Sequence, residues 1–108
     1  MAEYRIAVCD DDPVLREHLI HLCGSLLSEW GISHALTPFG TAAQLRDVLE
    51  REPASFDLLL LDIQMAGMSG MELARGLRAQ GNQVPLVFIT SHPDYALEGY
   101  EVHPVHYL

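Results

Sequence analysis

The chain has 108 residues, about half of them apolar, and 15 acidic against 6 basic side chains give it a formal charge of -9 with histidine neutral. This length predicts a single domain over residues 1–108, and the acidic balance excludes a nucleic-acid-binding surface, because phosphate neutralisation needs clustered Lys and Arg. The sequence contains neither a signal-peptide pattern nor an apolar run approaching the roughly 18 residues of a membrane span. We therefore expect a cytoplasmic protein with no membrane partner, in which Cys9 and Cys23 stay reduced.

The first two predicted elements are a strand and a helix. Tyr4–Cys9 is an apolar run with strand character. Asp12 can cap a helix and Pro13 can open it, and this helix is expected to end near Gly31. Its apolar residues recur at intervals of three or four, which predicts one inward face made of Leu15, Leu19, Leu22, Leu26 and Trp30.

The middle of the chain again has a predicted strand followed by a predicted helix, and then a further strand. Ser33–Phe39 is a weaker second strand, and Thr41 with Gln44 forms a capping-box pattern that opens a second helix. That helix carries three apolar residues inward, namely Leu45, Val48 and Leu49. Phe56–Leu61 is apolar at nearly every position, which is typical of a central strand covered on both faces.

The remaining elements follow a glycine-containing turn. Gly67 and Gly70 are expected to serve that turn through positive φ, and Ser69 with Glu72 forms a second capping box. The helix it opens carries Leu73, Ala74 and Leu77 inward. Three further elements are predicted in order, a strand, a short helix and the opening of a fifth strand, at Val84–Thr90, Asp94–Glu101 and Val105–Leu108. Alternating strands and helices indicate an α/β fold with a doubly wound, five-stranded parallel sheet.

Carboxylates follow the strands at one edge of this sheet. Asp10 and Asp11 follow the first strand, Asp62 the third, and Thr90 ends the fourth. In the expected strand order 2-1-3-4-5, strands one and three are neighbours, so their terminal aspartates face one another. Carboxylates about 4 Å apart repel by roughly 4 kcal/mol at an effective dielectric near 20. A cation or a bound proton must relieve this repulsion.

The candidate ligands are oxygen atoms, which favours a hard ion such as Mg²⁺ over zinc. Mg²⁺ typically keeps part of its shell for water and phosphate oxygens, which suggests phosphoryl chemistry. Asp62, on a rigid strand end, is then a carboxylate nucleophile able to form an aspartyl phosphate. Thr90 would offer its hydroxyl to the phosphate. Asp12 is interpreted as a helix cap, although a ligand role stays open.

Three motifs, "VCDDDP", "LLLLDIQMAGMSGMEL" and "VFITS", together resemble the receiver domain of two-component response regulators over the whole chain. The resemblance implies that Asp62 is the phosphoacceptor for a sensor histidine kinase. It also implies that Asp11 is a direct Mg²⁺ ligand, that Asp10 acts mostly through water, and that Gln64 contributes its backbone carbonyl. Thr90 matches the switch hydroxyl and Tyr107 the aromatic residue that reorients with it.

The segment "ITSHPDYALEGYEVHPVHYL" is similar to receivers that precede a LytTR-type DNA-binding domain. By register, the Lys of the family's Lys-Pro pair falls two residues beyond Leu108, and the family's last helix lies beyond it. We therefore expect a receiver truncated at its C-terminus, with metal binding retained and phosphorylation slowed. A homodimer through the fourth helix and fifth strand is also expected from the resemblance.

Other functions remain open at this point. A receiver-shaped module that acts without phosphorylation would keep the same fold. A phosphotransferase of the haloacid-dehalogenase type also places an Asp after a parallel strand, but it needs a second acid where Gln64 stands. A flavodoxin-like cofactor carrier would need a phosphate-cradling loop after the first strand, where "CDDDP" is acidic instead.

Overall fold

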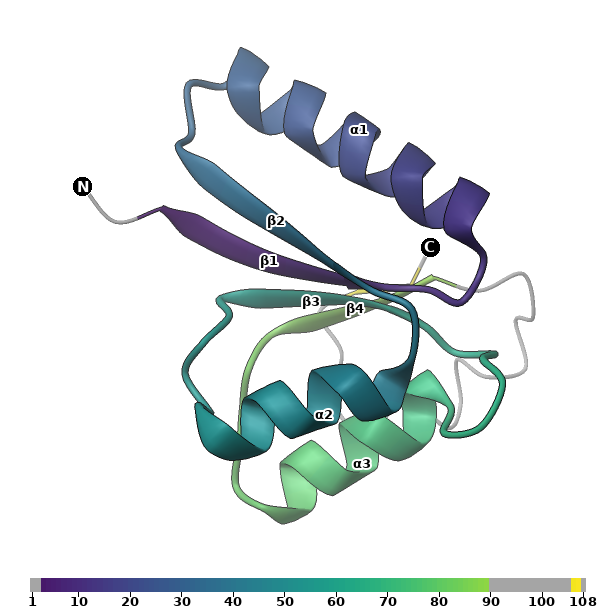
Figure 1. Cartoon of the computed structure of the whole chain (residues 1–108). Helices are drawn as coiled ribbons and strands as arrows, with labels where there is room; N and C mark the ends of the chain where they lie inside the picture. Colours follow the sequence, from purple (N-terminus) through teal and green to yellow (C-terminus); the bar gives the residue numbers. More distant parts are fainter. Residues whose placement is uncertain (1–2, 90–105, 108) are drawn as a thin grey trace.

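The protein is a parallel α/β sheet with helices on both faces (Figure 1). The computed structural model describes residues 3–89 and 106–107, the last two by their backbone. Its strands are β1 (Tyr4–Cys9), β2 (His34–Phe39), β3 (Leu58–Asp62), β4 (Leu86–Ile89) and β5 (His106–Tyr107). Its helices are α1 (Pro13–Glu29), α2 (Ala42–Arg51) and α3 (Gly70–Ala79).

The strand order places β1 and β3 side by side at the centre. Within the described residues the order is β2-β1-β3-β4-β5, and every neighbouring pair is parallel. The predicted parallel sheet and its order from β2 to β4 are thus confirmed. Of the predicted fifth strand at 105–108, residues 106–107 pair with β4 as β5, and residues 105 and 108 lie outside the described residues. The predicted helix at 94–101 lies outside the described residues.

The ends of two strands differ from the prediction. β3 begins at Leu58 rather than Phe56, and the Phe56 ring packs edge-on against Phe39 with ring centroids 5.8 Å apart. β4 begins at Leu86 rather than Val84, since Pro85 has no N–H to donate to a ladder. The end of the predicted fourth strand, Thr90, is outside the described residues.

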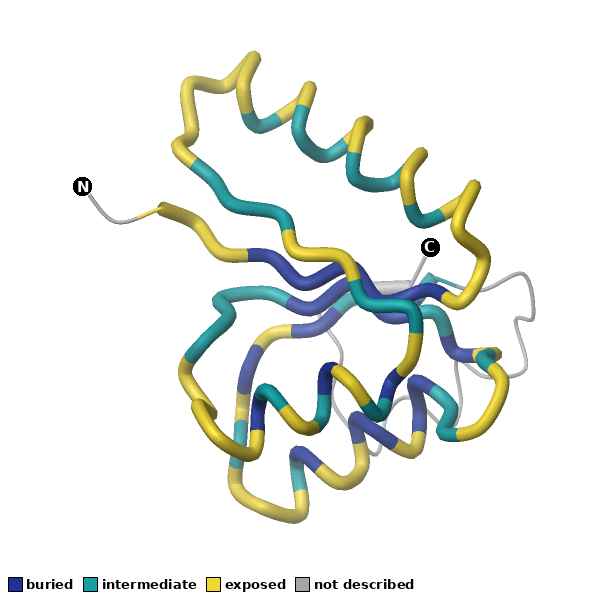
Figure 2. Tube along the Cα trace, in the orientation of Figure 1, coloured by how far each residue is buried: buried dark blue, intermediate teal, exposed yellow. Residues whose placement is uncertain are grey.

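Helix α1 buries a face that shares Leu19, but not the other predicted residues, with the one expected from the sequence. It has no fully buried residue, whereas α2 and α3 on the opposite face of the sheet have several (Figure 2). The prediction of an inward Leu22, Leu26 and Trp30 is wrong, because these side chains are 47%, 39% and 65% exposed. Leu15 is exposed as well, and the side chains that pack on the sheet are Leu19, Ile20, Cys23 and Leu27. Apolar residues occupy more than one stripe of this helix, so its periodicity alone does not select the stripe that faces the sheet.

The core is divided unequally by the sheet. The side covered by α2 and α3 contains the larger cluster, in which Leu45, Leu59, Leu61 and Phe88 are fully buried. The side covered by α1 contains only three buried members among the described residues, Ile6, Val8 and Leu60. Burial of apolar side chains at about 25 cal/mol per Å² is the main stabilising contribution, so α2, α3 and the two central strands form the rigid base of the carboxyl edge.

Both predicted capping residues of α2 and α3 are confirmed. The Thr41 hydroxyl accepts from Gln44 N at 3.2 Å, and the Ser69 hydroxyl accepts from Glu72 N at 3.1 Å. Gly67 has φ of 76°, as expected for the turn. Gly70 does not have positive φ; it is the first residue of α3, and the prediction that it serves the turn through such a φ is wrong.

Candidate metal and phosphoacceptor site

The parallel ladder brings two of the predicted aspartates to the same edge. Cys9 of β1 pairs with Leu61 of β3, so the next residues, Asp10 and Asp62, follow at the carboxyl ends of neighbouring strands. Ligand oxygens of Asp10, Asp11 and Asp62 all lie within 4.8 Å of one another. The predicted meeting of Asp11 and Asp62 is therefore observed, and Asp10 joins them.

Asp10 is the buried member of this acidic cluster. Its side chain is 1% exposed, and its Oδ1 accepts from Asp12 N at 2.9 Å. Its Oδ2 is buried and has no hydrogen-bond partner among the described residues. Burial raises the pKa of Asp10, and the charges of Asp11 and Asp12 raise it further, while the bond from Asp12 N opposes the change. A buried carboxylate oxygen without a donor needs a proton or a cation.

Asp62 is half-buried beside it. Burial raises the pKa of Asp62 to about 6, and the negative charges of Asp10 and Asp11 contribute in the same direction. The Gln64 N–H, 3.1 Å from Asp62 Oδ1, stabilises the ionised form and limits this rise. At neutral pH Asp62 is thus mostly ionised, in surroundings that strongly favour an added positive charge.

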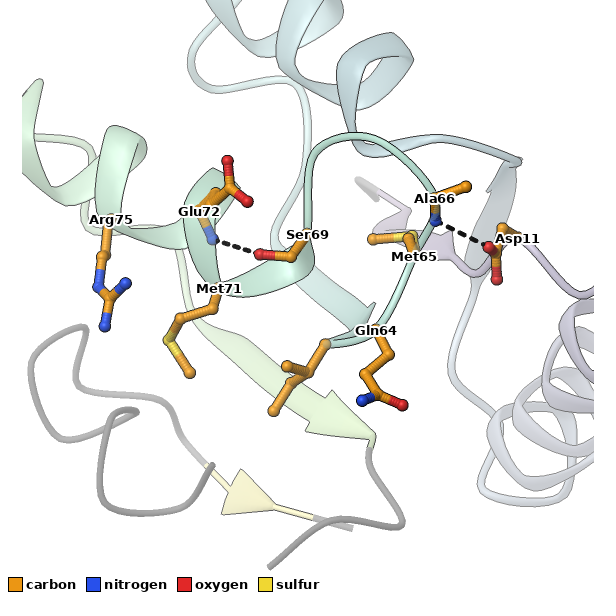
Figure 3. A pocket seen from close by; sticks show the side chains of 9 residues that line it. Asp11, Gln64, Met65, Ala66, Ser69, Met71, Glu72 and Arg75 are labelled. Carbon is orange, nitrogen blue, oxygen red and sulfur yellow. Dashed lines mark hydrogen bonds between the residues drawn. The ribbon is translucent and has the colours of Figure 1, made fainter. Parts of the chain in front are cut away.

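Asp11 connects the two loops that frame the cluster. Its side chain is exposed, and its Oδ2 accepts from Ala66 N at 3.0 Å (Figure 3). This bond joins the loop after β1 to the loop after β3. Beside it lies an open cavity of about 570 Å³. Its lining includes Asp11, Gln64, Met65, Ser69, Glu72 and Arg75.

Asp12 has the structural role that the sequence suggests. Its Oδ1 accepts from Val14 N at 3.0 Å and Leu15 N at 3.3 Å, which caps α1. Its carboxylate is not a member of the three-residue cluster. The helix cap, rather than a ligand, is the role supported by these bonds.

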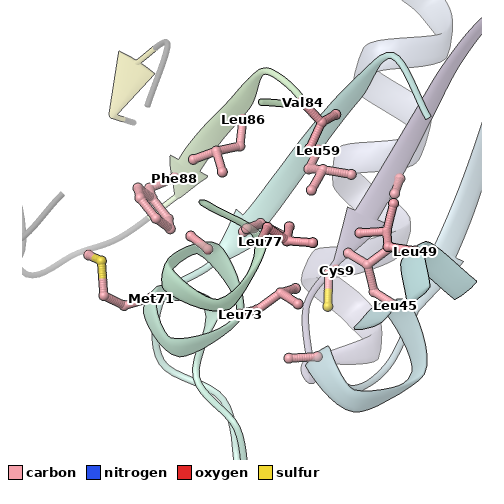
Figure 4. Packing of buried hydrophobic residues seen from close by; sticks show 14 of the residues in the cluster. Cys9, Leu45, Leu49, Leu59, Met71, Leu73, Leu77, Val84, Leu86 and Phe88 are labelled. Atoms are coloured by element: carbon pink, nitrogen blue, oxygen red, sulfur yellow. The ribbon is translucent and has the colours of Figure 1, made fainter. Parts of the chain in front are cut away.

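The donor set fits Mg²⁺. Three carboxylates converge, and one contributes a buried oxygen without a donor, an arrangement suited to a hard cation. Cys9, the nearest sulfur along the chain, packs instead in the core below the cluster, beside Leu45 and Leu73 (Figure 4). Burial raises the pKa of the Cys9 thiol to about 12, with contributions from Asp10 and Asp62, so it stays protonated and is a poor metal ligand.

The remaining predicted site residues are only partly described. Gln64 lies in the loop directly after β3 and is exposed, and the ligand role of its carbonyl stays a prediction. Thr90 lies outside the described residues. The backbone of Tyr107 belongs to β5, but its side chain is not described, so the switch formed by these two residues also stays a prediction.

Sequence reasoning missed two contacts that hold the site together. The Arg16 Nη1 donates to Asp10 O at 2.8 Å, and the Ala66 N–H donates to Asp11 Oδ2. The Arg16–Asp10 contact is local in the sequence, because Arg16 follows Asp10 by only six residues, across the start of α1. The second joins residues 55 apart in the sequence, and nothing in the local pattern indicates it.

Comparison with known proteins agrees with this geometry. Residues 6–108 match the family described as the response regulator receiver domain. The chain belongs to this family. A solved structure, the signal receiver domain of the response regulator NarL from Mycobacterium tuberculosis, superposes with a TM-score of 0.80 at 23% identity, covering 100% of this chain and 84% of that one. This likeness shows the receiver fold.

Two curated relatives extend the comparison. This receiver is 36% identical over 105 residues to an uncharacterized response regulatory protein of Vibrio cholerae, covering 97% of this chain and 38% of the relative. It is 30% identical over 104 residues to the sensory transduction protein LytT of Bacillus subtilis, covering 96% of this chain and 41% of the relative. The chain thus spans about two fifths of these relatives, and the resemblance to LytTR-type receivers agrees with the match to LytT.

No helix within residues 3–89 is long and apolar enough to cross a membrane.

Proposed function

We propose that Asp62 of this receiver accepts a phosphoryl group from a phosphohistidine of a sensor histidine kinase, or from a small acyl phosphate. The observation that carries the proposal is the convergence of Asp10, Asp11 and Asp62 within 4.8 Å at the ends of adjacent parallel strands. Membership of the receiver family supports this role, since receiver domains act in phosphoacceptor signalling. The rigid end of β3 holds the nucleophile, and the loop after β1 supplies the other two carboxylates.

In the transfer, an Asp62 carboxylate oxygen attacks phosphorus and forms an acyl phosphate bond. The bond from phosphorus to the donor nitrogen or oxygen breaks, and its electron pair stays on the donor, which takes up a proton when it is imidazole. Mg²⁺ held by Asp10, Asp11, Asp62 and the Gln64 carbonyl would supply positive charge against the phosphoryl oxygens. Asp62 must be ionised to attack, and its pKa of about 6 leaves it so at neutral pH.

Downstream of the transfer, Thr90 and Tyr107 are proposed to form the switch that reshapes the surface of the fourth helix and fifth strand. A shift between two receiver states is the general means by which such a modification acts at a distance. A LytTR-type DNA-binding domain is the proposed output. The match to LytT and the two-fifths coverage of the relatives support this.

The test is phosphorylation by a small acyl phosphate with Mg²⁺, followed by intact mass. One phosphoryl group per chain is expected for the wild type, with none for Asp62→Asn and none in EDTA. A matched control is Asp57→Asn, since Asp57 directly precedes β3, away from the carboxyl edge, and pairs with Arg5. Continuous turnover of a phosphomonoester would indicate a phosphotransferase instead, and an unmodified wild type would indicate an interaction module that acts without phosphorylation.

A further inference from the structure

Arg16 is tied to the loop that carries two of the acidic residues. It is half-buried in the first turn of α1. Its backbone N–H donates to Asp12 O at 2.9 Å, and its side-chain Nη1 donates to Asp10 O at 2.8 Å. These two bonds hold the segment between β1 and α1 against the first turn of α1.

The carbonyl that Arg16 binds belongs to the peptide between Asp10 and Asp11. The other side of Asp10 is also fixed, because Asp10 N donates to Phe39 O at the end of β2, at 3.1 Å. With its N–H held by β2 and its C=O held by Arg16, the Asp10 backbone has little freedom to rotate. That backbone sets the directions in which the Asp10 and Asp11 carboxylates leave the chain.

Arg16 does not act as the counter-ion of these carboxylates. Among the described residues the ion pairs join Arg5 to Asp57 and Arg46 to Asp47 and Glu50, and none involves Arg16. The guanidinium donates to a backbone oxygen and leaves the carboxylates available for a metal ion. A positive charge near the cluster would by itself oppose Mg²⁺ binding, whereas orientation of the carboxylates would favour it. Removal of the Arg16 side chain should therefore tighten Mg²⁺ binding if Arg16 acts through its charge, and weaken it if Arg16 orients the carboxylates.

We infer that Arg16 is a positioning residue for the metal site, which orients Asp10 and Asp11 by holding the Asp10 carbonyl. The inference rests on the proposed function, since that function assigns Mg²⁺ to the cluster. Residues that orient metal ligands through a second hydrogen bond typically contribute 10–100-fold to metal affinity. Arg16 bonds to the backbone of a ligand rather than to its side chain, so we expect the lower end, about tenfold.

Three variants test the inference. Arg16→Met removes both the donor and the charge at similar side-chain length, and Arg16→Lys keeps a donor and the charge. Arg51→Met is the charge-matched control, because Arg51 is exposed in the last turn of α2 and donates to Asp47 O, away from the carboxyl edge. Mg²⁺ affinity is measured by calorimetry, and hydrogen exchange of the Asp12 amide, which donates to Asp10 Oδ1, is measured by NMR in EDTA.

We expect Arg16→Met to weaken Mg²⁺ binding about tenfold and to speed exchange of the Asp12 amide without metal. Arg16→Lys should recover most of both properties, and Arg51→Met should match the wild type. Arg16→Gln, whose shorter amide does not reach the Asp10 carbonyl, replaces Arg16→Met if circular dichroism shows that Arg16→Met is unfolded.

Unchanged or tighter Mg²⁺ binding by Arg16→Met would overturn the inference, because loss of a residue that orients the metal ligands must weaken binding. The proposed function would then stand, provided that the wild type binds Mg²⁺ and is phosphorylated. A wild type that binds no Mg²⁺ would overturn the proposed metal site, and this inference with it.

Discussion

Gly70 lies directly against the backbone of Asp62. A Cβ atom at position 70 would overlap the Asp62 carbonyl oxygen and lie 3.0 Å from its carbonyl carbon. The Gly70 N–H also donates to Ile63 O at 3.0 Å, which holds the start of α3 against the end of β3. The position of the proposed phosphoacceptor therefore depends on the absence of a side chain eight residues later.

Gly70→Ala is expected to lower the free energy of unfolding by about 2 kcal/mol, because backbone atoms must move to admit the methyl group. Gly76→Ala is the matched control in the same helix. Among the described residues nothing lies within 4 Å of a Cβ at that position, so this variant should be more stable than the wild type by about 0.5–1 kcal/mol. Urea denaturation measures both. Similar losses in the two variants would contradict the role of the close approach.

Asp62→Asn is expected to stabilise the metal-free protein near neutral pH. The folded pKa of Asp62, about 6, lies above its usual value, so the stability contributed by this group is fully present below about pH 4 and is lost as the pH rises through about 6. Asn does not ionise and avoids that loss. Because Asp62 is only half-buried, solvent screening reduces the expected gain to about 1 kcal/mol.

Mg²⁺ should reverse this order of stabilities. A ligand at a hundredfold excess over its Kd stabilises the folded state by about 2.7 kcal/mol, and the variant, which lacks one charged ligand, should gain less. Thermal denaturation in EDTA and in Mg²⁺ gives the comparison. Equal responses of the two proteins to Mg²⁺ would remove Asp62 from the metal site.

The affinity for Mg²⁺ is expected to fall as the pH is lowered through about 6, because protonation of Asp62 removes a charged ligand. Above that pH the affinity should level off. Asp62→Asn should lack this titration step and bind weakly at every pH. Calorimetric titrations across the range test the assignment, and a wild-type profile that is flat through pH 6 would refute it.

Asp12→Ala is expected to cost about 1 kcal/mol of stability through loss of the cap on α1. Asp12→Ser, which can cap without a charge, should recover most of it. Mg²⁺ affinity should stay roughly unchanged in both, since Asp12 lies outside the cluster of ligand oxygens. A strong fall in affinity for both variants would instead make Asp12 a ligand.

Leu22→Ala should cost less than about 1 kcal/mol, because the Leu22 side chain is 47% exposed. Leu45→Ala, in the buried cluster under α2, should cost about 3 kcal/mol. Chemical denaturation of both variants shows whether Leu22 contributes to stability as a buried leucine does. A large loss of stability in Leu22→Ala would instead support the inward face predicted from periodicity.

Local patterns in the sequence were sufficient for the order of the described elements and for the residues that cap the helices, but not for the ends of the strands. Asp12, Thr41 and Ser69 cap the helices as predicted, because a cap depends on residues two or three positions away. The apolar run of β3 identified a central strand. Asp62 at its end, with Asp10 and Asp11 after β1, was sufficient to predict where the acidic residues meet, since parallel strands align their carboxyl ends.

Other features were decided only by the tertiary structure. Beside the predicted Leu19, the sheet selected Cys23 and Leu27 of α1 rather than Leu22 and Leu26, because several apolar stripes on that helix were available for burial. The need for glycine at position 70 came from the Asp62 backbone rather than from a turn. The Asp11–Ala66 bond and the raised pKa of Asp62 arise between segments some fifty residues apart. Sequence patterns report neighbours along the chain, whereas burial, close approach and charge repulsion depend on neighbours in space.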